Sequence, residues 1–299
     1  MAPSPALLTQ AFNTKPWVIL SPIERSIKRK IEAIGTPLKD WSISINYGIK
    51  TGFNDAFIIN GAKKDELISA DPKSAEIIRP ILRGRDIKRY RYDFADLWLI
   101  NTHNGIKEKG IKPVNVEDYP VIKKHLDFYY PQLEKRADKG DTPYNLRNCA
   151  YMEDFYKQKI VYPTVMRLPR NESLHDEFPS FSYDFDGLFI DVGGYIMVGE
   201  EIDLVFLYLS SDVGFYTFSK FHNRFQLDTT GFLYTKESLK ETLVPLFDES
   251  TSCKLRDAGK KLPSNMENIE RIIEEFCGFD ESEKEQIRKY KKNLLSSEK

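Results

Sequence analysis

The side chains best suited to binding chemistry are concentrated between Arg79 and Tyr92, fourteen residues that hold six cations and one acid. An arginine can hold a phosphate through two hydrogen bonds and can also read a guanine edge, so this basic block suits contact with a polyanion. Three aliphatic residues interrupt the charge, which indicates a folded scaffold and not a solvated tail. A turn in which the arginines pair with nearby acids fits the same residues. The candidate contacts in the block are Arg83, Arg85, Lys88 and Arg89.

A second candidate is the glycine-containing stretch Gly48–Asn54, which reads Gly-Ile-Lys-Thr-Gly-Phe-Asn. Glycines let backbone amides approach a phosphate closely, and the side-chain donors here are Lys50, Thr51 and Asn54. The stretch is not a P-loop, because the Gly-Lys-Ser/Thr ending and its spacing are missing. An ordinary β-turn is the alternative interpretation.

The third candidate is the polar stretch Lys139–Tyr151, in which Gly140 and Pro143 predict a loop. Asparagine and arginine are the side chains suited to adenine and guanine edges, so Asn145, Arg147 and Asn148 are candidate base readers. The same residue types are also common loop formers, and the spacing alone favours that simpler interpretation.

Catalytic alternatives are few. Asp71 with Asp86 and Lys88 echoes the acidic and lysine pattern of Mg²⁺-dependent nucleases, although such short patterns often arise by chance. Asp86 is better explained as a local partner of the neighbouring arginines. The four histidines are scattered and fall in no nucleophile or metal motif: His103, His125, His175 and His222. We therefore expect sites for binding and no active site in this chain.

The whole chain is nearly neutral, which limits the ways in which it could bind a polyanion. Its 299 residues carry 44 Lys and Arg against 45 Asp and Glu, so an anion site must be a local patch. Cys149, Cys253 and Cys277 have neither zinc nor disulfide spacing, which fits free thiols in a reducing compartment. No signal peptide or membrane-spanning run is recognised, so a cytoplasmic location is expected.

The elements around these candidates predict an α+β fold with mixed or antiparallel, β-rich structure. Ser21-Pro22-Ile23-Glu24 has the composition of a helix start. Alternation of apolar and polar residues predicts a strand at 41–48. Further helices are predicted at 63–70, 120–136, 204–218 and twice after 265, and further strands near 57–59, 97–100, 159–163, 181–183, 188–191 and 195–198. The predicted divisions are a flexible lead-in at 1–20, a helix at 21–37, a main domain at 38–245 and a C-terminal helical segment at 246–299.

Taken in order, several of these segments resemble a known family. They are Trp41–Asn60, Ile81–Tyr90, Tyr119–Leu126 and Leu133–Arg147, with looser matches at Lys159–Pro163, Tyr195–Gly199 and Leu207–Ser211. Together they resemble the TaqI-like C-terminal specificity domain of restriction-modification proteins, especially the fused type IIG class that carries an N6-adenine methyltransferase. The resemblance covers residues from about 20 to 290.

The resemblance implies a bacterial target-recognition domain, with 38–245 holding double-stranded DNA for a methyltransferase or endonuclease domain or subunit. The methyltransferase motif Asn-Pro-Pro-Tyr and the glycine-rich S-adenosylmethionine loop are absent from this sequence. The chain is therefore expected to be non-catalytic and to hold no cofactor, with S-adenosylmethionine and Mg²⁺ confined to the catalytic partner. Another possibility is a protein-interaction module in which the helices Ile23–Ile34 and Ile269–Phe276 bind a partner and the basic block is incidental.

Overall fold

The computed structural model describes residues 20–169, 171, 173, 177–222, 226–228 and 231–296. Nearly all of the predicted lead-in and the last three residues lie outside these ranges. Eleven α-helices are present in the described part: α1 Pro22–Ile34, α2 Asn54–Phe57, α3 Gly61–Ala70, α4 Pro120–Asp127, α5 Tyr130–Lys135, α6 Ile202–Leu209, α7 Asp212–Tyr216, α8 Lys236–Leu239, α9 Glu249–Gly259, α10 Met266–Phe276 and α11 Glu281–Ser296.

Short strands form four small sheets, nearly all antiparallel. The sheet orders are β2-β10-β6-β8, β3-β5-β4-β9, β11-β12-β7 and β1-β13, and only the β4–β9 pair is parallel among these named strands. The strand bounds are β1 Gly35–Pro37, β2 Ile43–Tyr47, β3 Ile58–Asn60, β4 Ile78–Leu82, β5 Leu97–Ile100, β6 Lys159–Pro163, β7 Val165–Arg167, β8 Ser182–Asp184, β9 Phe189–Ile190, β10 Gly194–Gly199, β11 Gln226–Asp228, β12 Gly231–Leu233 and β13 Leu243–Pro245. The α+β fold predicted from the sequence is confirmed.

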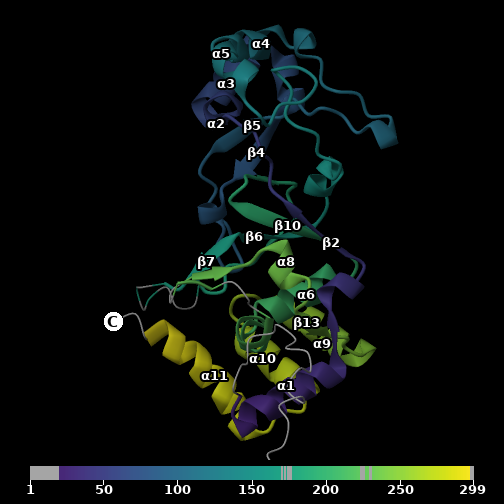
Figure 1. Cartoon of the computed structure of the whole chain (residues 1–299), viewed down its shortest axis with the longest axis vertical. Coiled ribbons are helices and arrows are strands. Elements are labelled where there is room, and N and C mark those ends of the chain that lie inside the picture. Colours follow the sequence, from purple (N-terminus) through teal and green to yellow (C-terminus); the bar gives the residue numbers. More distant parts are fainter. Residues whose placement is uncertain are drawn as a thin grey trace, which may run out of the picture.

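The molecule is elongated and has two hydrophobic cores, one above the other in Figure 1. The upper core is built mainly from residues 49–155 around the β3-β5-β4-β9 sheet, with α2 to α5 packed over it. The lower core joins the β2-β10-β6-β8 sheet to helices from both ends of the described chain. The segment 38–245 contributes to both cores, and the predicted C-terminal segment contributes to the lower one.

The N-terminal helix α1 begins where the sequence predicts, because Ser21 and Glu24 form a reciprocal cap. The Ser21 Oγ accepts from the Glu24 amide at 3.3 Å, and the Ser21 amide donates to the Glu24 carboxylate at 2.7 Å. Ile27 and Ile31 are then fully buried on the inner face of the helix.

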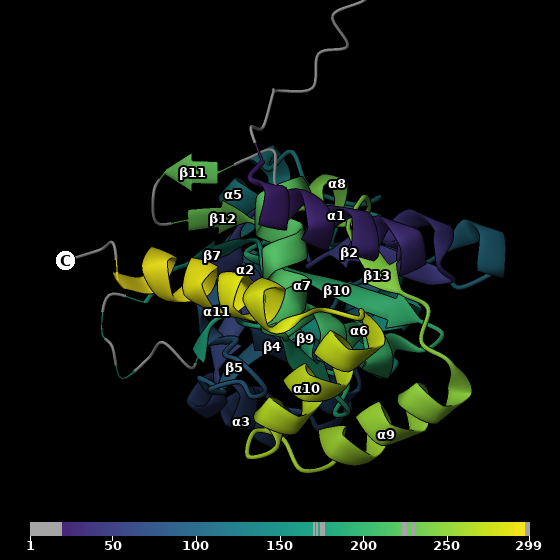
Figure 2. The ribbon, with the colours of Figure 1, turned by 90° about the horizontal axis from the view of Figure 1, so that it is seen from below.

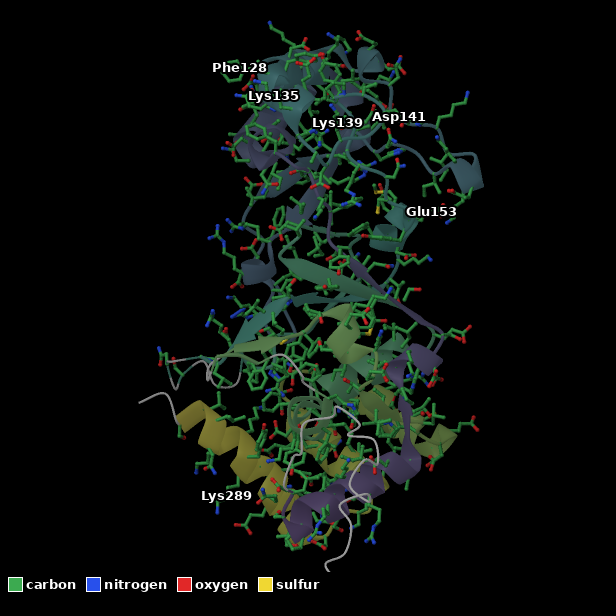
Figure 3. The ribbon with its side chains drawn as sticks, viewed as in Figure 1. Phe128, Lys135, Lys139, Asp141, Glu153 and Lys289 are labelled. Atoms are coloured by element: carbon green, nitrogen blue, oxygen red, sulfur yellow. The ribbon has the colours of Figure 1, made fainter. Side chains whose placement is uncertain are left out.

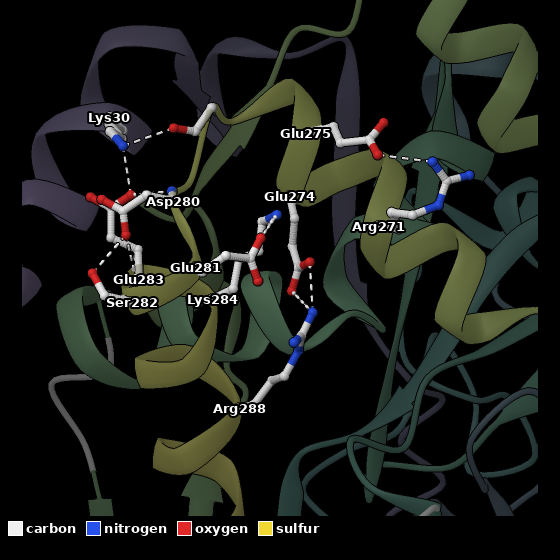
Figure 4. Close-up of polar contacts among 11 residues, drawn as sticks. Lys30, Arg271, Glu274, Glu275, Asp280, Glu281, Ser282, Glu283, Lys284 and Arg288 are labelled. Atoms are coloured by element: carbon white, nitrogen blue, oxygen red, sulfur yellow. Dashed lines mark hydrogen bonds and ion pairs between the residues drawn. The ribbon is translucent and has the colours of Figure 1, made fainter.

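The C-terminal helices pack beneath the lower sheet and against α1. Seen from below in Figure 2, α9, α10, α11 and α1 surround α6 and α7. Lys30 of α1 donates to the Gly278 carbonyl at 2.8 Å and to the Glu283 carboxylate at 2.5 Å (Figure 4). Arg288 of α11 donates to both carboxylate oxygens of Glu274 at 2.8 Å. Polar contacts therefore fix these helices as part of the same body.

Two predicted helices are each divided in the structure. The predicted 120–136 helix is divided into α4 and α5 just before Pro131, as its sequence suggested. The predicted 204–218 helix breaks at Ser210 and Ser211, because the Ser211 hydroxyl accepts from the Gly214 amide at 2.9 Å and starts α7 as a new helix. Among the described residues, no helix combines the length and apolarity needed to cross a bilayer.

Candidate nucleic-acid interface

Three segments that are far apart in the sequence meet between the two cores, and we call their meeting point the junction (residues 48–50, 82–84 and 190–194). The Asp191 amide donates to the Leu82 carbonyl at 2.9 Å, and Ile49 forms a parallel bridge with Asp191. The Gly48 amide donates to the Gly194 carbonyl at 3.0 Å. The junction therefore places the glycine-containing loop after β2 beside the basic block after β4.

The junction requires glycine at two positions because the backbones touch there. A Cβ atom added to Gly84 would lie 2.2 Å from the Gly193 carbonyl oxygen, and one added to Gly48 would lie 1.8 Å from the Asp191 carbonyl oxygen. The Asp191 carboxylate holds the contact by accepting from the Gly193 amide at 2.8 Å and the Gly84 amide at 3.3 Å. Gly193-Gly194, which had no clear meaning in the sequence, faces the Arg-Gly-Arg turn.

Arg83 stabilises this turn through hydrogen bonds to Asp86. Its guanidinium donates two hydrogen bonds to Asp86, at 2.8 and 2.7 Å, and the Arg83 amide donates a third at 2.9 Å. Burial by itself would raise the pKa of Asp86, but the hydrogen bonds from Arg83 outweigh burial and hold that pKa below its usual value. The carboxylate is thus an organiser of the turn, as the sequence suggested.

The nuclease alternative finds no support in this geometry. Asp71 caps the short 3₁₀ turn that follows it, accepting from the Lys73 amide at 3.1 Å, while Asp86 is committed to Arg83. Within the described ranges, no three His, Cys, Asp or Glu side chains gather as a metal site would require.

The next two cations are Arg85, which is exposed, and Lys88, which is partly buried. Neither side chain forms a hydrogen bond or ion pair with a residue that the structure describes. They line a shallow groove of about 650 Å³, which we call the basic groove. Its other walls come from the Asp191–Gly193 turn and from the segment Pro163–Arg167.

Arg89 turns inward instead. It donates to the Ser210 carbonyl at 2.5 Å, and its guanidinium lies 4.9 Å from the centre of the Tyr90 ring. The contact ties the basic block to the end of α6. In this conformation the Arg89 side chain is used between elements of the protein, so its role as a phosphate contact stays a prediction.

A second depression of about 570 Å³ is lined by Val192 of the Asp191–Gly193 turn, and we call it the loop hollow. It is lined by Tyr47–Lys50 from one loop and by Leu146–Cys149 from another, so the second and third candidate segments share one surface. Lys50 and Arg147 are each about half exposed, and both approach the Asp138 carboxylate, at 3.9 and 3.0 Å. Asn148 is exposed at the rim, where its side-chain oxygen accepts from Asn104.

Two of the predicted contact residues, Thr51 and Asn145, are used mainly inside the protein. Thr51 is 2% exposed and donates to the Asn54 side chain at 2.5 Å. Asn145 is also 2% exposed and is held by Thr142 and by the Val114 carbonyl, at 2.6 and 2.8 Å. The side chains of Thr51 and Asn145 are therefore engaged within the protein, whereas Asn54 is exposed at the surface.

The residue that organises the loop hollow was missed by the sequence analysis. Arg136 is only 7% exposed and donates to four backbone carbonyls, those of Thr51, Asp138, Pro143 and Asn145. Its guanidinium lies 4.5 Å from the centre of the Phe57 ring. Burial lowers the pKa of Arg136 to about 10, so the side chain is still a cation at neutral pH. An arginine at a helix end gives no sequence signal of such a role.

The chain that carries these surfaces has a fold that is also found in enzymes of restriction-modification systems. The chain superimposes on the type IIL restriction-modification enzyme MmeI, solved in complex with DNA, with a TM-score of 0.59 and 13% identity. It also superimposes on the type IIG restriction endonuclease BpuSI, with a TM-score of 0.54 and 14% identity.

These superpositions cover most of this chain and a minor part of each enzyme. They include 87% and 93% of the chain but only 36% and 33% of MmeI and BpuSI, so the chain spans about a third of their length. No protein-family model matches the sequence. A comparison with curated proteins likewise finds no match. At these identities the similarity is one of fold.

Proposed function

We propose that this chain is the DNA-recognition part of a restriction-modification enzyme and binds double-stranded DNA in a sequence-specific manner. The observation that carries the proposal is the pairing of the basic groove with the loop hollow across the Asp191–Gly193 turn. Exposed cations on a folded scaffold supply phosphate contacts, and amide or guanidinium groups at a rim supply base contacts. The fold shared with MmeI, whose structure contains DNA, supports the same assignment.

We propose revised roles for the predicted contact residues. Arg85 and Lys88 would contact phosphates from the basic groove, while Lys50 and Arg147 would do so from the loop hollow. Asn54 and Asn148 are the exposed amides left to read base edges. Arg83, Arg89, Thr51 and Asn145 would support these contacts from within the protein.

The catalytic steps are assigned to another domain or chain. The two structural neighbours are about three times as long as the region matched here, so a methyltransferase or nuclease would lie outside this chain. Methylation at adenine, with S-adenosylmethionine and Mg²⁺ held only by that partner, is the part of the proposal that rests on the resemblance to TaqI-like specificity domains. A bacterial, cytoplasmic setting belongs to the same part.

The alternative of a protein-interaction module is less well supported. The apolar faces proposed for partner binding are occupied, because Ile27, Ile31, Ile269 and Ile273 are buried in the lower core of this same chain. Those faces are therefore not available to a partner in this conformation.

The proposal is tested by DNA binding of the full chain to a duplex of mixed sequence, measured by fluorescence anisotropy from low to physiological salt. Arg85→Ala with Lys88→Ala should weaken binding and reduce the salt dependence by about 0.9 per lost phosphate contact. Lys289→Ala with Lys292→Ala is the matched control, because both lysines are exposed on α11 and neither lines the basic groove or the loop hollow (Figure 3 labels Lys289, in the lower part of the molecule). Absence of DNA binding by the wild-type chain at low salt would refute the proposal.

A further inference from the structure

A small hairpin at residues 105–112 projects from the upper part of the molecule, on the right in Figure 1. It is closed by Ile106 and Ile111, whose backbones exchange hydrogen bonds of 2.9 and 3.1 Å. Gly105 and Gly110 take the left-handed conformation, with φ of +70° and +69°, and form the two bends. Ile106 is buried in the upper core, so the hairpin is anchored and not a loose loop.

The hairpin is tied at both ends to the segment that lines the loop hollow. At its base, buried Asn104 donates to Asp141 at 3.0 Å and also to the side chain of Asn148. At its tip, Lys109 forms an ion pair with Glu153, one residue after the hollow-lining Met152. The hairpin therefore runs alongside residues 148–153, next to the Lys50–Arg147 side of the interface.

The exposed face of the hairpin is cationic. Lys107 and Lys112 are exposed, and neither side chain forms an ion pair or hydrogen bond with a described residue. Lys109 is neutralised by Glu153, which leaves Glu108 as the acid within the hairpin itself. Lysines held on an anchored projection and not engaged in ion pairs suit contact with the phosphates of a duplex.

We propose that the 105–112 hairpin is a second DNA-contacting element, which places Lys107 and Lys112 on the phosphate backbone beside the loop hollow. This inference rests on the proposed function and names a surface that no sequence motif indicated. The Asn104–Asn148 hydrogen bond couples the hairpin to the loop that carries Arg147. Phosphate contacts by the hairpin would therefore fix the position of the candidate base reader Asn148.

The first experiment measures the salt dependence of duplex binding for Lys107→Ala with Lys112→Ala, in the full chain. Loss of two phosphate contacts should reduce the slope of log K against log salt by about 1.8. Lys289→Ala with Lys292→Ala again serves as the matched control and should leave the slope unchanged. Because neither hairpin lysine pairs through its side chain with a described residue, the double variant should unfold at the wild-type urea concentration.

The second experiment needs no variant. Lysine acetylation of the wild-type chain, read by mass spectrometry with and without duplex DNA, should show protection at Lys107 and Lys112 but not at Lys289 and Lys292. If the wild-type chain binds DNA while both hairpin lysines stay unprotected and the slope is unchanged, the hairpin assignment is overturned and the proposed function stands. If the wild-type chain binds no duplex at low salt, both fall.

Discussion

Replacement of Arg136 gives the sharpest test of how the interface is built. The guanidinium donates to four backbone carbonyls that belong to three separate stretches, around Thr51, Asp138 and 143–145. A methionine at this position has a similar length and no donor, so Arg136→Met removes all four hydrogen bonds and keeps most of the packing against Phe57.

The expected loss can be worked from these contacts. A hydrogen bond from a charged donor contributes about 1.5 kcal/mol at the low end of its range, so four such bonds represent about 6 kcal/mol. Burial of the Arg136 cation costs several kcal/mol of desolvation free energy, and this cost is absent when methionine takes its place. The same burial lowers the pKa of Arg136 to about 10. We therefore expect a net loss of about 2–4 kcal/mol in the free energy of unfolding.

The assay is urea unfolding followed by tryptophan fluorescence, with hydrogen exchange of residues 48–54 and 138–148 as a local readout. Arg147→Met is the matched control, because Arg147 is about half exposed and makes a single ion pair with Asp138. It should lose less than about 1 kcal/mol of stability but should weaken DNA binding. If Arg136→Met unfolds at the wild-type urea concentration and leaves exchange unchanged in both loops, the assignment of Arg136 as their organiser is wrong.

Three further predictions address other parts of the fold. Lys159→Met should lower the free energy of unfolding by about 3–5 kcal/mol in urea titrations, because it leaves the fully buried Asp184 carboxylate without its cation. The double variant Lys159→Met with Asp184→Asn should recover part of this stability. Equal losses for the single and the double variant would contradict this account. Burial, the largest cause, raises the pKa of Glu270 from 4.5 to about 8, so its contribution to stability is complete below pH 4.5 and is lost as the pH rises through 8. Glu270→Gln should therefore flatten the pH dependence of the unfolding midpoint between pH 5 and pH 9, and an unchanged profile would show that another group is responsible. Gly84→Ala should weaken DNA binding and lower the thermal midpoint of unfolding, because the added methyl group would lie 2.2 Å from the Gly193 carbonyl oxygen. Gly110→Ala is the control: its methyl group would meet no atom within 4 Å, so it should affect stability only through the backbone conformation of residue 110.

Local signals in the sequence were sufficient for much of the secondary structure. The Ser21-Pro22-Ile23-Glu24 start predicted α1, since a cap depends on residues three apart in the chain. Alternation predicted β2, and Gly278, with φ of +65°, ends the helical stretch after α10. In each case the stabilising contacts lie within a few residues, so the sequence contains them directly.

Strand partners and helix breaks depended on contacts that the sequence does not contain. β4 overlaps the start of the basic block, and its pairing with β9 joins residues more than a hundred positions apart. The break between α6 and α7 required the Ser211 cap to prevail over a continuous apolar pattern. The local sequence pattern is compatible with different strand partners and with either a continuous or a divided helix, so it does not predict which of them forms.

The sequence by itself determined where the cations and amides of the candidate interface lie along the chain, and that they fall in three ordered segments. Only the tertiary structure decided which of them face solvent. Arg83 and Arg85 are of one type and two positions apart, yet Arg83 is bound to Asp86 while Arg85 is exposed at the basic groove. The same distinction separates Thr51 from Lys50 and Asn145 from Arg147. The physical reason is that a polar side chain forms hydrogen bonds with the groups that the fold places beside it. These groups, such as the Ser210 carbonyl for Arg89, come from distant parts of the chain.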